Sequence, residues 1–142
     1  MRLWLIVAAT GCWAPSYQVG SLDGEVHHLG CVDIAVRGAW PHEAVGPVVV
    51  IELGNRCEHS VPVDLRRLEV FHDGTRLKAF DPDDEIDARR IDARQTGAEW
   101  IEYRAPSRID GLDALDVDLG RVVDADASPH VVRIAVPQRE AP

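Results

Sequence analysis

Apolar and polar residues alternate with a period of two along most of the chain after residue 30. The alternating stretches are residues 32–37, 61–65, 98–104, 115–119 and 132–136. Such alternation places successive side chains on opposite faces and is typical of a half-buried β-strand. Residues 47–53 are more continuously apolar, which predicts a central strand buried on both faces. Pro62 lies inside one alternating stretch and predicts an edge strand there, because proline cannot donate a ladder hydrogen bond.

The dipeptide Asp73-Gly74 is the strongest local signal in the sequence RLEVFHDGTRLKAF, residues 67–80. A two-residue type I′ turn requires positive φ at both central positions, and Asp-Gly satisfies this requirement. The turn sets a register that pairs apolar residues on one side of the hairpin and opposite charges on the other. The predicted pairs are Val70 with Leu77, Leu68 with Ala79, and Glu69 with Lys78.

These patterns predict seven or eight short strands separated by Gly, Pro and Asp turns, with no long helix. The fold class that follows is all-β, a two-sheet β-sandwich. In this layout alone, the body resembles small immunoglobulin-like modules of bacterial envelope proteins. A resemblance of layout does not carry a function.

The first twelve residues differ from the rest of the chain. Arg2 supplies a positive charge, residues 3–9 are an unbroken apolar run, and small residues lead to Cys12. This order of regions is typical of an export signal. A membrane span requires about 20 apolar residues, so this run is too short to cross a bilayer. An ordinary secretory signal and a buried first strand are the alternatives.

The sequence Ala9-Thr10-Gly11-Cys12 resembles the lipobox of bacterial lipoproteins. The resemblance covers residues 1–12 only and implies that the thiol of Cys12 receives a diacylglyceryl group. The signal would then be cleaved before Cys12, and the acylated protein would remain membrane-bound in the cell envelope, facing the periplasm or the exterior. The expected domains are a signal peptide at 1–11, an acylated flexible tether at 12–29, a β-sandwich at 30–137 and a disordered tail at 138–142.

The chain contains three cysteines, and an odd number leaves one thiol unpaired in an exported protein. If Cys12 carries lipid, Cys31 and Cys57 remain as a pair in an oxidising compartment. The strands that follow Cys31 and precede Cys57 would meet across a Gly- and Pro-containing loop. An antiparallel return would therefore bring the two cysteines to the same end, which favours a disulfide over free thiols or a metal site.

The net charge of −9 argues against a nucleic-acid partner, because an acidic surface repels phosphate backbones. The same balance argues against docking on anionic lipid through a basic face. None of the five serines has a nucleophile-elbow setting, and no glycine-rich phosphate loop is present. The sequence thus predicts a protein that is not an enzyme, although an enzyme of unrecognised type remains an alternative.

Two candidate binding features remain. Asp81, Asp83, Asp84 and Glu85 form an acidic run whose oxygens could bind calcium, with a solvated loop as the alternative. Trp100 alternates away from Ile101 and Tyr103 and could be an exposed binding anchor. The favoured alternative is that its ring covers the edge or core of the second sheet.

The sequence therefore predicts a cell-envelope lipoprotein with a recognition or structural role and no cofactor. Its partners would be the membrane, through the lipid anchor, and an envelope protein or polysaccharide. A calcium-dependent binding module of the envelope is the alternative function.

Overall fold

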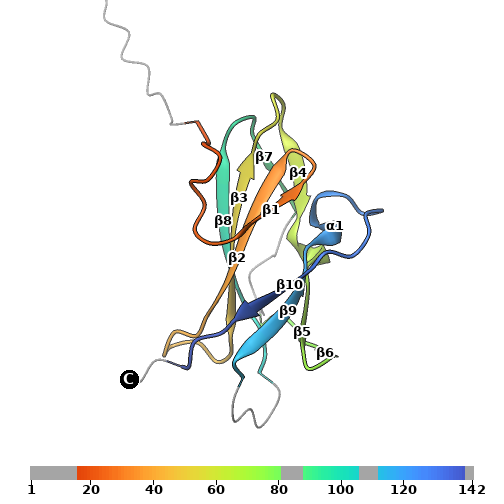
Figure 1. The fold of residues 1–142 in the computed structure, drawn as a ribbon. Helices are drawn as coiled ribbons and strands as arrows, with labels where there is room; N and C mark the ends of the chain where they lie inside the picture. Colours follow the sequence, from red (N-terminus) through yellow and green to blue (C-terminus); the bar gives the residue numbers. More distant parts are fainter. Residues whose placement is uncertain (1–15, 81–87, 106–111, 140–142) are drawn as a thin grey trace, which may run out of the picture.

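Strand β3 (Val48–Asn55) lies inside a four-stranded antiparallel sheet in the computed structural model, which describes residues 16–80, 88–105 and 112–139. Its neighbours are β2 (Val32–Ala39) and β8 (Thr96–Glu102), and β1 (Val26–Leu29) pairs with the outer side of β2. The prediction of a central strand at 47–53 is therefore confirmed (Figure 1).

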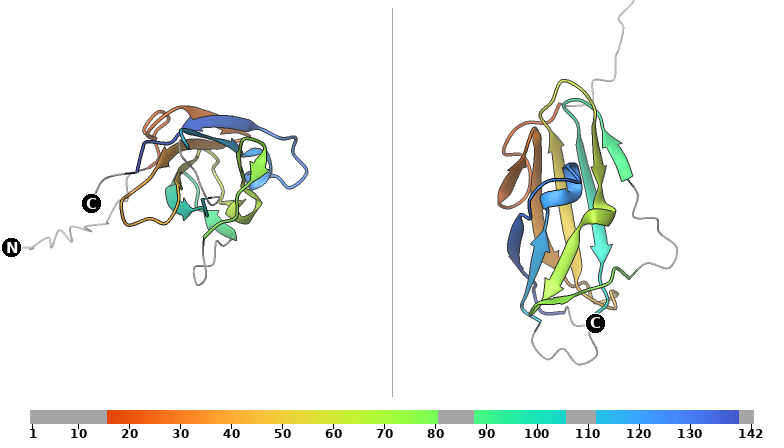
Figure 2. Two further views of the ribbon diagram at one scale, coloured as in Figure 1. Left: turned by 90° about the horizontal axis from the view of Figure 1, so that it is seen from below. Right: turned by 90° about the vertical axis from the view of Figure 1, so that its right-hand side faces the viewer.

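A second four-stranded sheet faces the first, as the two views of Figure 2 show. Its strands, in spatial order, are β10 (Val131–Ala135), β9 (Ala114–Asp118), β5 (Glu69–His72) and β6 (Thr75–Arg76). A separate two-stranded ladder joins β4 (Val61–Asp64) to β7 (Ala88–Ile91), so the strand containing Pro62 has a single partner. The helical elements in the described residues are two short turns, η1 (Leu65–Arg67) and α1 (Gly120–Val123).

The all-β sandwich predicted from the sequence is confirmed, while its immunoglobulin-like layout remains a resemblance. The described residues form ten strands rather than seven or eight. The additional strands are β1 and β7, which the alternation pattern did not indicate. Both are four residues long and have two polar residues between apolar ends, VHHL and ARRI, so they show no alternation with a period of two.

The core lies between the two large sheets and consists of aliphatic side chains from their inner faces. The fully buried contributors include Ile34, Ile51 and Leu53 from the first sheet and Leu115 and Val117 from the second. Their alternation along each strand supplies the inward-facing surface that packs the sheets together. Burying each of these side chains contributes roughly 1.5–3 kcal/mol, which makes this layer the main source of stability.

The predicted hairpin is present, with Asp73 and Gly74 at φ values of 46° and 78°. The backbone N–H of Leu77 donates to the Val70 carbonyl at 2.8 Å, as the predicted register requires. The predicted Glu69–Lys78 ion pair does not form, because Glu69 pairs diagonally with Arg76 at 3.5 Å. After Arg76 the chain leaves the second sheet, and Ala79 forms a bridge to Tyr103 next to the first sheet.

The prediction of a flexible tether at residues 12–29 is wrong for the part that the structure describes. Tyr17 and Leu22 are buried, and they pack with Ala35 and Val26 on the outer face of the first sheet. Residues Val26–Leu29 form β1. The sandwich therefore extends toward the N-terminus by at least a dozen residues beyond the predicted boundary at residue 30. In the predicted tail, the Arg139 side chain donates to the His42 carbonyl at 2.9 Å, and residues 140–142 lie outside the described residues.

Candidate binding site

The structure joins Cys31 and Cys57 in a disulfide, with 5.5 Å between their Cα atoms. The cysteines meet because β2 and β3 run antiparallel with Val32 opposite Asn55, so both lie just beyond the same end of the ladder. The side-chain amide of Asn55, which is fully buried, donates to the carbonyl groups of His59 and Ile91. Its oxygen accepts the Cys57 N–H at 2.8 Å, so Asn55 fixes the turn that carries the disulfide.

Asp33 is a fully buried carboxylate next to the disulfide, and sequence reasoning missed it. It accepts hydrogen bonds from the Tyr17 hydroxyl at 2.8 Å, from His28 Nδ1 at 2.6 Å and from Arg56 Nε at 2.8 Å. The alternation pattern placed Asp33 on the solvent side of a half-buried strand, and that prediction is wrong. Tyr17 covers the outer face of β2, so a carboxylate on this face loses its water and must find protein donors.

The electrostatics of this network are those of a satisfied buried charge. Burial raises the pKa of Asp33, but the hydrogen bonds from His28, Tyr17 and Arg56 lower it by more, so the pKa lies below its usual value. The pKa of Tyr17 is raised to about 12, first by burial and then by its hydrogen bond to Asp33. At neutral pH Asp33 is therefore ionised and Tyr17 keeps its proton.

Trp100 lies on the outer face of edge strand β8, and 58% of its surface is exposed. The expectation that its ring covers the core is wrong. The Arg37 guanidinium carbon lies 5.6 Å from the ring centroid, and Arg37 also approaches the Asp23 carboxylate at 3.4 Å. A role for Trp100 in binding stays a prediction.

Cys12 and the acidic run Asp81, Asp83, Asp84 and Glu85 lie outside the described residues, so acylation and calcium binding also stay predictions. In residues 16–80, 88–105 and 112–139, no three His, Cys, Asp or Glu side chains form a group suited to a metal ion. Across the same ranges, every helix is too short or too polar to span a bilayer.

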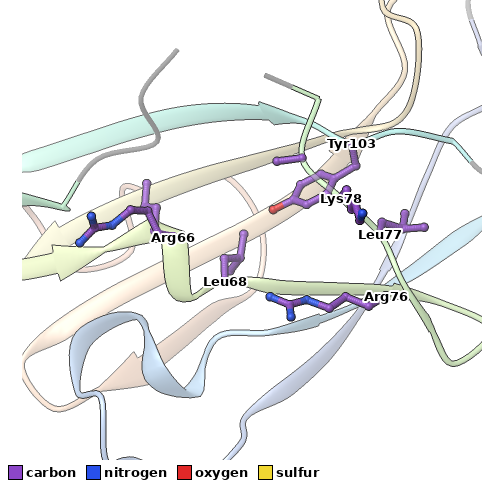
Figure 3. A pocket seen from close by; sticks show the side chains of 8 residues that line it. Arg66, Leu68, Arg76, Leu77, Lys78 and Tyr103 are labelled. Carbon is purple, nitrogen blue, oxygen red and sulfur yellow. The ribbon is translucent and has the colours of Figure 1, made fainter. Parts of the chain in front are cut away.

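A hollow of about 400 Å³ lies beside the β5–β6 hairpin. Three cationic side chains, Arg66, Arg76 and Lys78, belong to its lining. The apolar part of the lining comes from Leu65, Leu68, Leu77, Ala79 and Tyr103. Figure 3 shows Arg66 and Arg76 on two sides of Leu68, with the Tyr103 hydroxyl directed into the space between them. Burial raises the pKa of Tyr103, so this hydroxyl keeps its proton and can donate a hydrogen bond.

A second hollow of about 300 Å³ shares Arg76 with the first and is also lined by Arg67, Glu69 and Arg121. Two carboxylates partly compensate these cations. Asp64 accepts from Arg66 Nε at 2.8 Å and approaches Arg67 at 3.4 Å, and Glu69 approaches Arg76. Lys78 and Arg121 have no ion-pair partner among the described residues. We call this surface, defined by Arg66, Arg67, Arg76, Lys78 and Arg121, the basic face.

Sequence reasoning missed the basic face because net charge gives no information on where charges gather. One signal was available. Arg66, Arg67, Arg76 and Lys78 flank the Asp73-Gly74 turn, and a hairpin brings the two flanks side by side. Arg121 comes from the α1 turn, distant in sequence, and only the tertiary fold adds it.

The sandwich is similar in fold to a solved structure from Bacillus subtilis subsp. subtilis str. 168, described as a "putative lipoprotein (ycdA)". The two share 12% sequence identity with a TM-score of 0.54, and the similarity covers 81% of this chain. The chain spans 39% of that structure's length. At this identity the similarity concerns the fold alone. No protein-family model and no curated protein sequence matches the chain.

Proposed function

We propose that this chain is a lipid-anchored protein of the bacterial cell envelope, whose β-sandwich is a non-enzymatic recognition or structural module held close to the membrane. Cleavage before Cys12 and acylation of its thiol would supply the anchor. The fold shared with a chain described as a "putative lipoprotein" supports this proposal.

The observation that carries the proposal is that the domain begins almost immediately after the lipobox. Tyr17 is already buried, and its backbone N–H donates to the carbonyl of Arg94 in the turn between β7 and β8. Cleavage before Cys12 would leave Tyr17 and its hydrogen bonds to Asp33 and Arg94 in the mature chain. Five residues from Cys12 to Tyr17 reach at most about 18 Å, whereas a flexible tether from 12 to 29 would allow about 60 Å.

The buried polar groups support a non-enzymatic role. Asp33, Asn55 and Asp118 are the buried polar or charged residues of the described chain, and each is hydrogen-bonded within the protein. Asp118 accepts the backbone N–H groups of Gly120 and His130 and thereby fixes the α1 turn against the start of β10. Polar groups whose hydrogen bonds are all made within the protein stabilise the fold, whereas a catalytic group must be able to form a hydrogen bond with a substrate.

The test is metabolic labelling with an alkyne analogue of palmitate, followed by detergent phase partition. The unmodified chain should carry the label and enter the detergent phase. Cys12→Ser should lose the label and either remain unprocessed or enter the aqueous phase. The matched control is the double variant Cys31→Ser, Cys57→Ser, which removes two thiols and should keep the label. Retention of the label by Cys12→Ser would refute the anchor.

A further inference from the structure

We propose that the basic face binds an anionic polysaccharide, a chain with regularly repeated carboxylate or phosphate groups. This site lies on a protein whose overall charge of −9 would disfavour such a ligand. The argument rests on the local excess of positive charge, the shape of the two hollows and their place in the fold.

Counted over the described residues, the charge of this surface is opposite in sign to the charge of the whole chain. Five cationic side chains line the two hollows. Among the described residues, Asp64 contacts Arg66 and Arg67, and Glu69 contacts Arg76. The Arg76–Glu69 contact is 3.5 Å long with an exposed guanidinium, and such a surface ion pair is weak and easily exchanged. Lys78 and Arg121 hold uncompensated charge within the described structure. An anionic ligand would supply the missing counter-charges through charge-assisted hydrogen bonds.

The shape of the surface favours a chain over a single small ion. The two hollows adjoin and share Arg76, with Lys78 belonging to the first and Arg121 to the second. A small anion would contact one hollow, whereas a polymer with repeated charges can contact Lys78, Arg76 and Arg121 together. Leu65, Leu68 and the Tyr103 ring provide an apolar floor on which a sugar ring can rest, and the Tyr103 hydroxyl can donate to a sugar oxygen.

The position of the basic face favours a polymer over the lipid bilayer. The described chain begins at one end of the sandwich, and the β5–β6 hairpin lies at the opposite end (Figure 1). A domain anchored at Cys12 would direct this hairpin away from its own membrane. This choice of ligand source rests on the proposed anchor, whereas the binding of anionic groups does not.

The experiment uses the full chain carrying Cys12→Ser, so that no acyl group contributes to binding. Its affinity for polygalacturonate, which carries carboxylates, and for polyphosphate is measured by titration calorimetry over a range of salt concentrations. Neutral dextran is the reference polymer. We expect micromolar or tighter binding to at least one polyanion, no binding to dextran, and an affinity that falls steadily with salt because counterions are released. The polyanion bound more tightly identifies the charged group.

Lys78→Glu and Arg121→Glu, each added alone, should weaken binding about tenfold or more, because each removes a charged contact and adds a repulsive one. Arg90→Glu is the matched control, because Arg90 is an exposed arginine on β7 outside the basic face. This variant should bind the polyanions with unchanged affinity. Unchanged thermal melting will show that all three variants fold.

No polyanion binding, or an equal loss of affinity in Arg90→Glu, would overturn the proposal. Tighter binding to vesicles of equimolar phosphatidylcholine and phosphatidylglycerol than to either polymer would overturn the polysaccharide assignment. That outcome leaves the palmitate-labelling result on Cys12 unaffected.

Discussion

A charged side chain is buried and paired at the disulfide end of the sandwich, whereas charged side chains are exposed on the basic face. At the disulfide end, Asp33 is fully buried, and three side chains donate hydrogen bonds to it. On the basic face, five cationic side chains lie together and remain exposed, and Lys78 and Arg121 have no ion-pair partner among the described residues. A buried charge that is satisfied internally stabilises one conformation, whereas an exposed charge without a partner can attract a ligand. The first region therefore stabilises the fold, and the second is the surface that we propose for ligand binding.

The largest expected effect is at Asp33. Replacing it in Asp33→Ala leaves the Arg56 guanidinium and the Tyr17 hydroxyl without their acceptor, and should lower the free energy of unfolding by about 3–5 kcal/mol. Urea denaturation measures this difference. The control is Asp116→Ala on β9, which removes a half-buried carboxylate paired with the exposed Arg133 at 3.3 Å and should cost less than about 1 kcal/mol. Equal losses of unfolding free energy in both variants would show that the buried Asp33 network stabilises the fold no more than a surface ion pair does.

Reduction of the disulfide should have the next largest effect. Cys31 and Cys57 are 26 residues apart in sequence, and a cross-link closing a loop of this length stabilises by roughly 3–4 kcal/mol. Thermal melting with and without dithiothreitol tests this. The Cys31→Ser, Cys57→Ser variant should melt at the lower temperature under both conditions, which separates loss of the cross-link from other effects of the reductant.

Gly54→Ala tests whether the Tyr17 segment belongs to the domain. A Cβ at position 54 would lie 2.2 Å from the Tyr17 ring, so the ring must move away from β3. We expect a loss of about 1–3 kcal/mol from overpacking, together with rapid protease cleavage within residues 16–25. Gly97→Ala on β8 is the control, because its Cβ would meet the flexible ends of two side chains, Ile91 at 3.3 Å and Arg89 at 4.0 Å. If Gly54→Ala were as resistant to protease as the unmodified protein, the Tyr17 segment would not depend on packing against Gly54 of β3.

The smallest expected effect is a pH dependence at the junction of β1 and β10. His27 and His130 stack edge to face with their ring nitrogens 3.2 Å apart, a hydrogen bond that requires at least one neutral ring. The pKa of His27 is lowered, first by burial and also by His130 and His28, while Glu25 acts in the opposite direction. The unfolded chain therefore binds this proton more readily than the folded chain.

Stability contributed by His27 should accordingly be present above pH 6.5, decrease as the pH falls below that value, and level off below the native pKa. Melting temperatures between pH 5 and 8 measure the slope. His27→Gln should flatten this part of the profile, and His42→Gln, which replaces a more exposed histidine, should leave the slope as it is. An unchanged slope in His27→Gln would assign the pH dependence to another group.

Elements with a local signal could be predicted from the amino-acid sequence. Asp73-Gly74 specifies its turn through the φ values that these two residues tolerate, and the alternation at 115–119 and 132–136 specifies the strands β9 and β10. The parity of the cysteines and the antiparallel return between them indicated the disulfide. The lipobox is equally local, and it gives the proposed location without any knowledge of the fold.

Which face of the first sheet is exposed to solvent depends on contacts between distant parts of the chain. The alternation around Asp33 is that of a half-buried strand, and nothing near it in the sequence reveals that Tyr17 covers it. The Tyr17 ring fits against β3 because Gly54 has no side chain, and the Tyr17 N–H donates to the carbonyl of Arg94 after β7. The Asp33 carboxylate that Tyr17 covers also accepts hydrogen bonds from His28 and Arg56, which come from two other parts of the chain. The basic face likewise needs Arg121 to approach a hairpin far away in sequence. Burial and local charge are sums over neighbours in space, so the order of residues along the chain does not specify them.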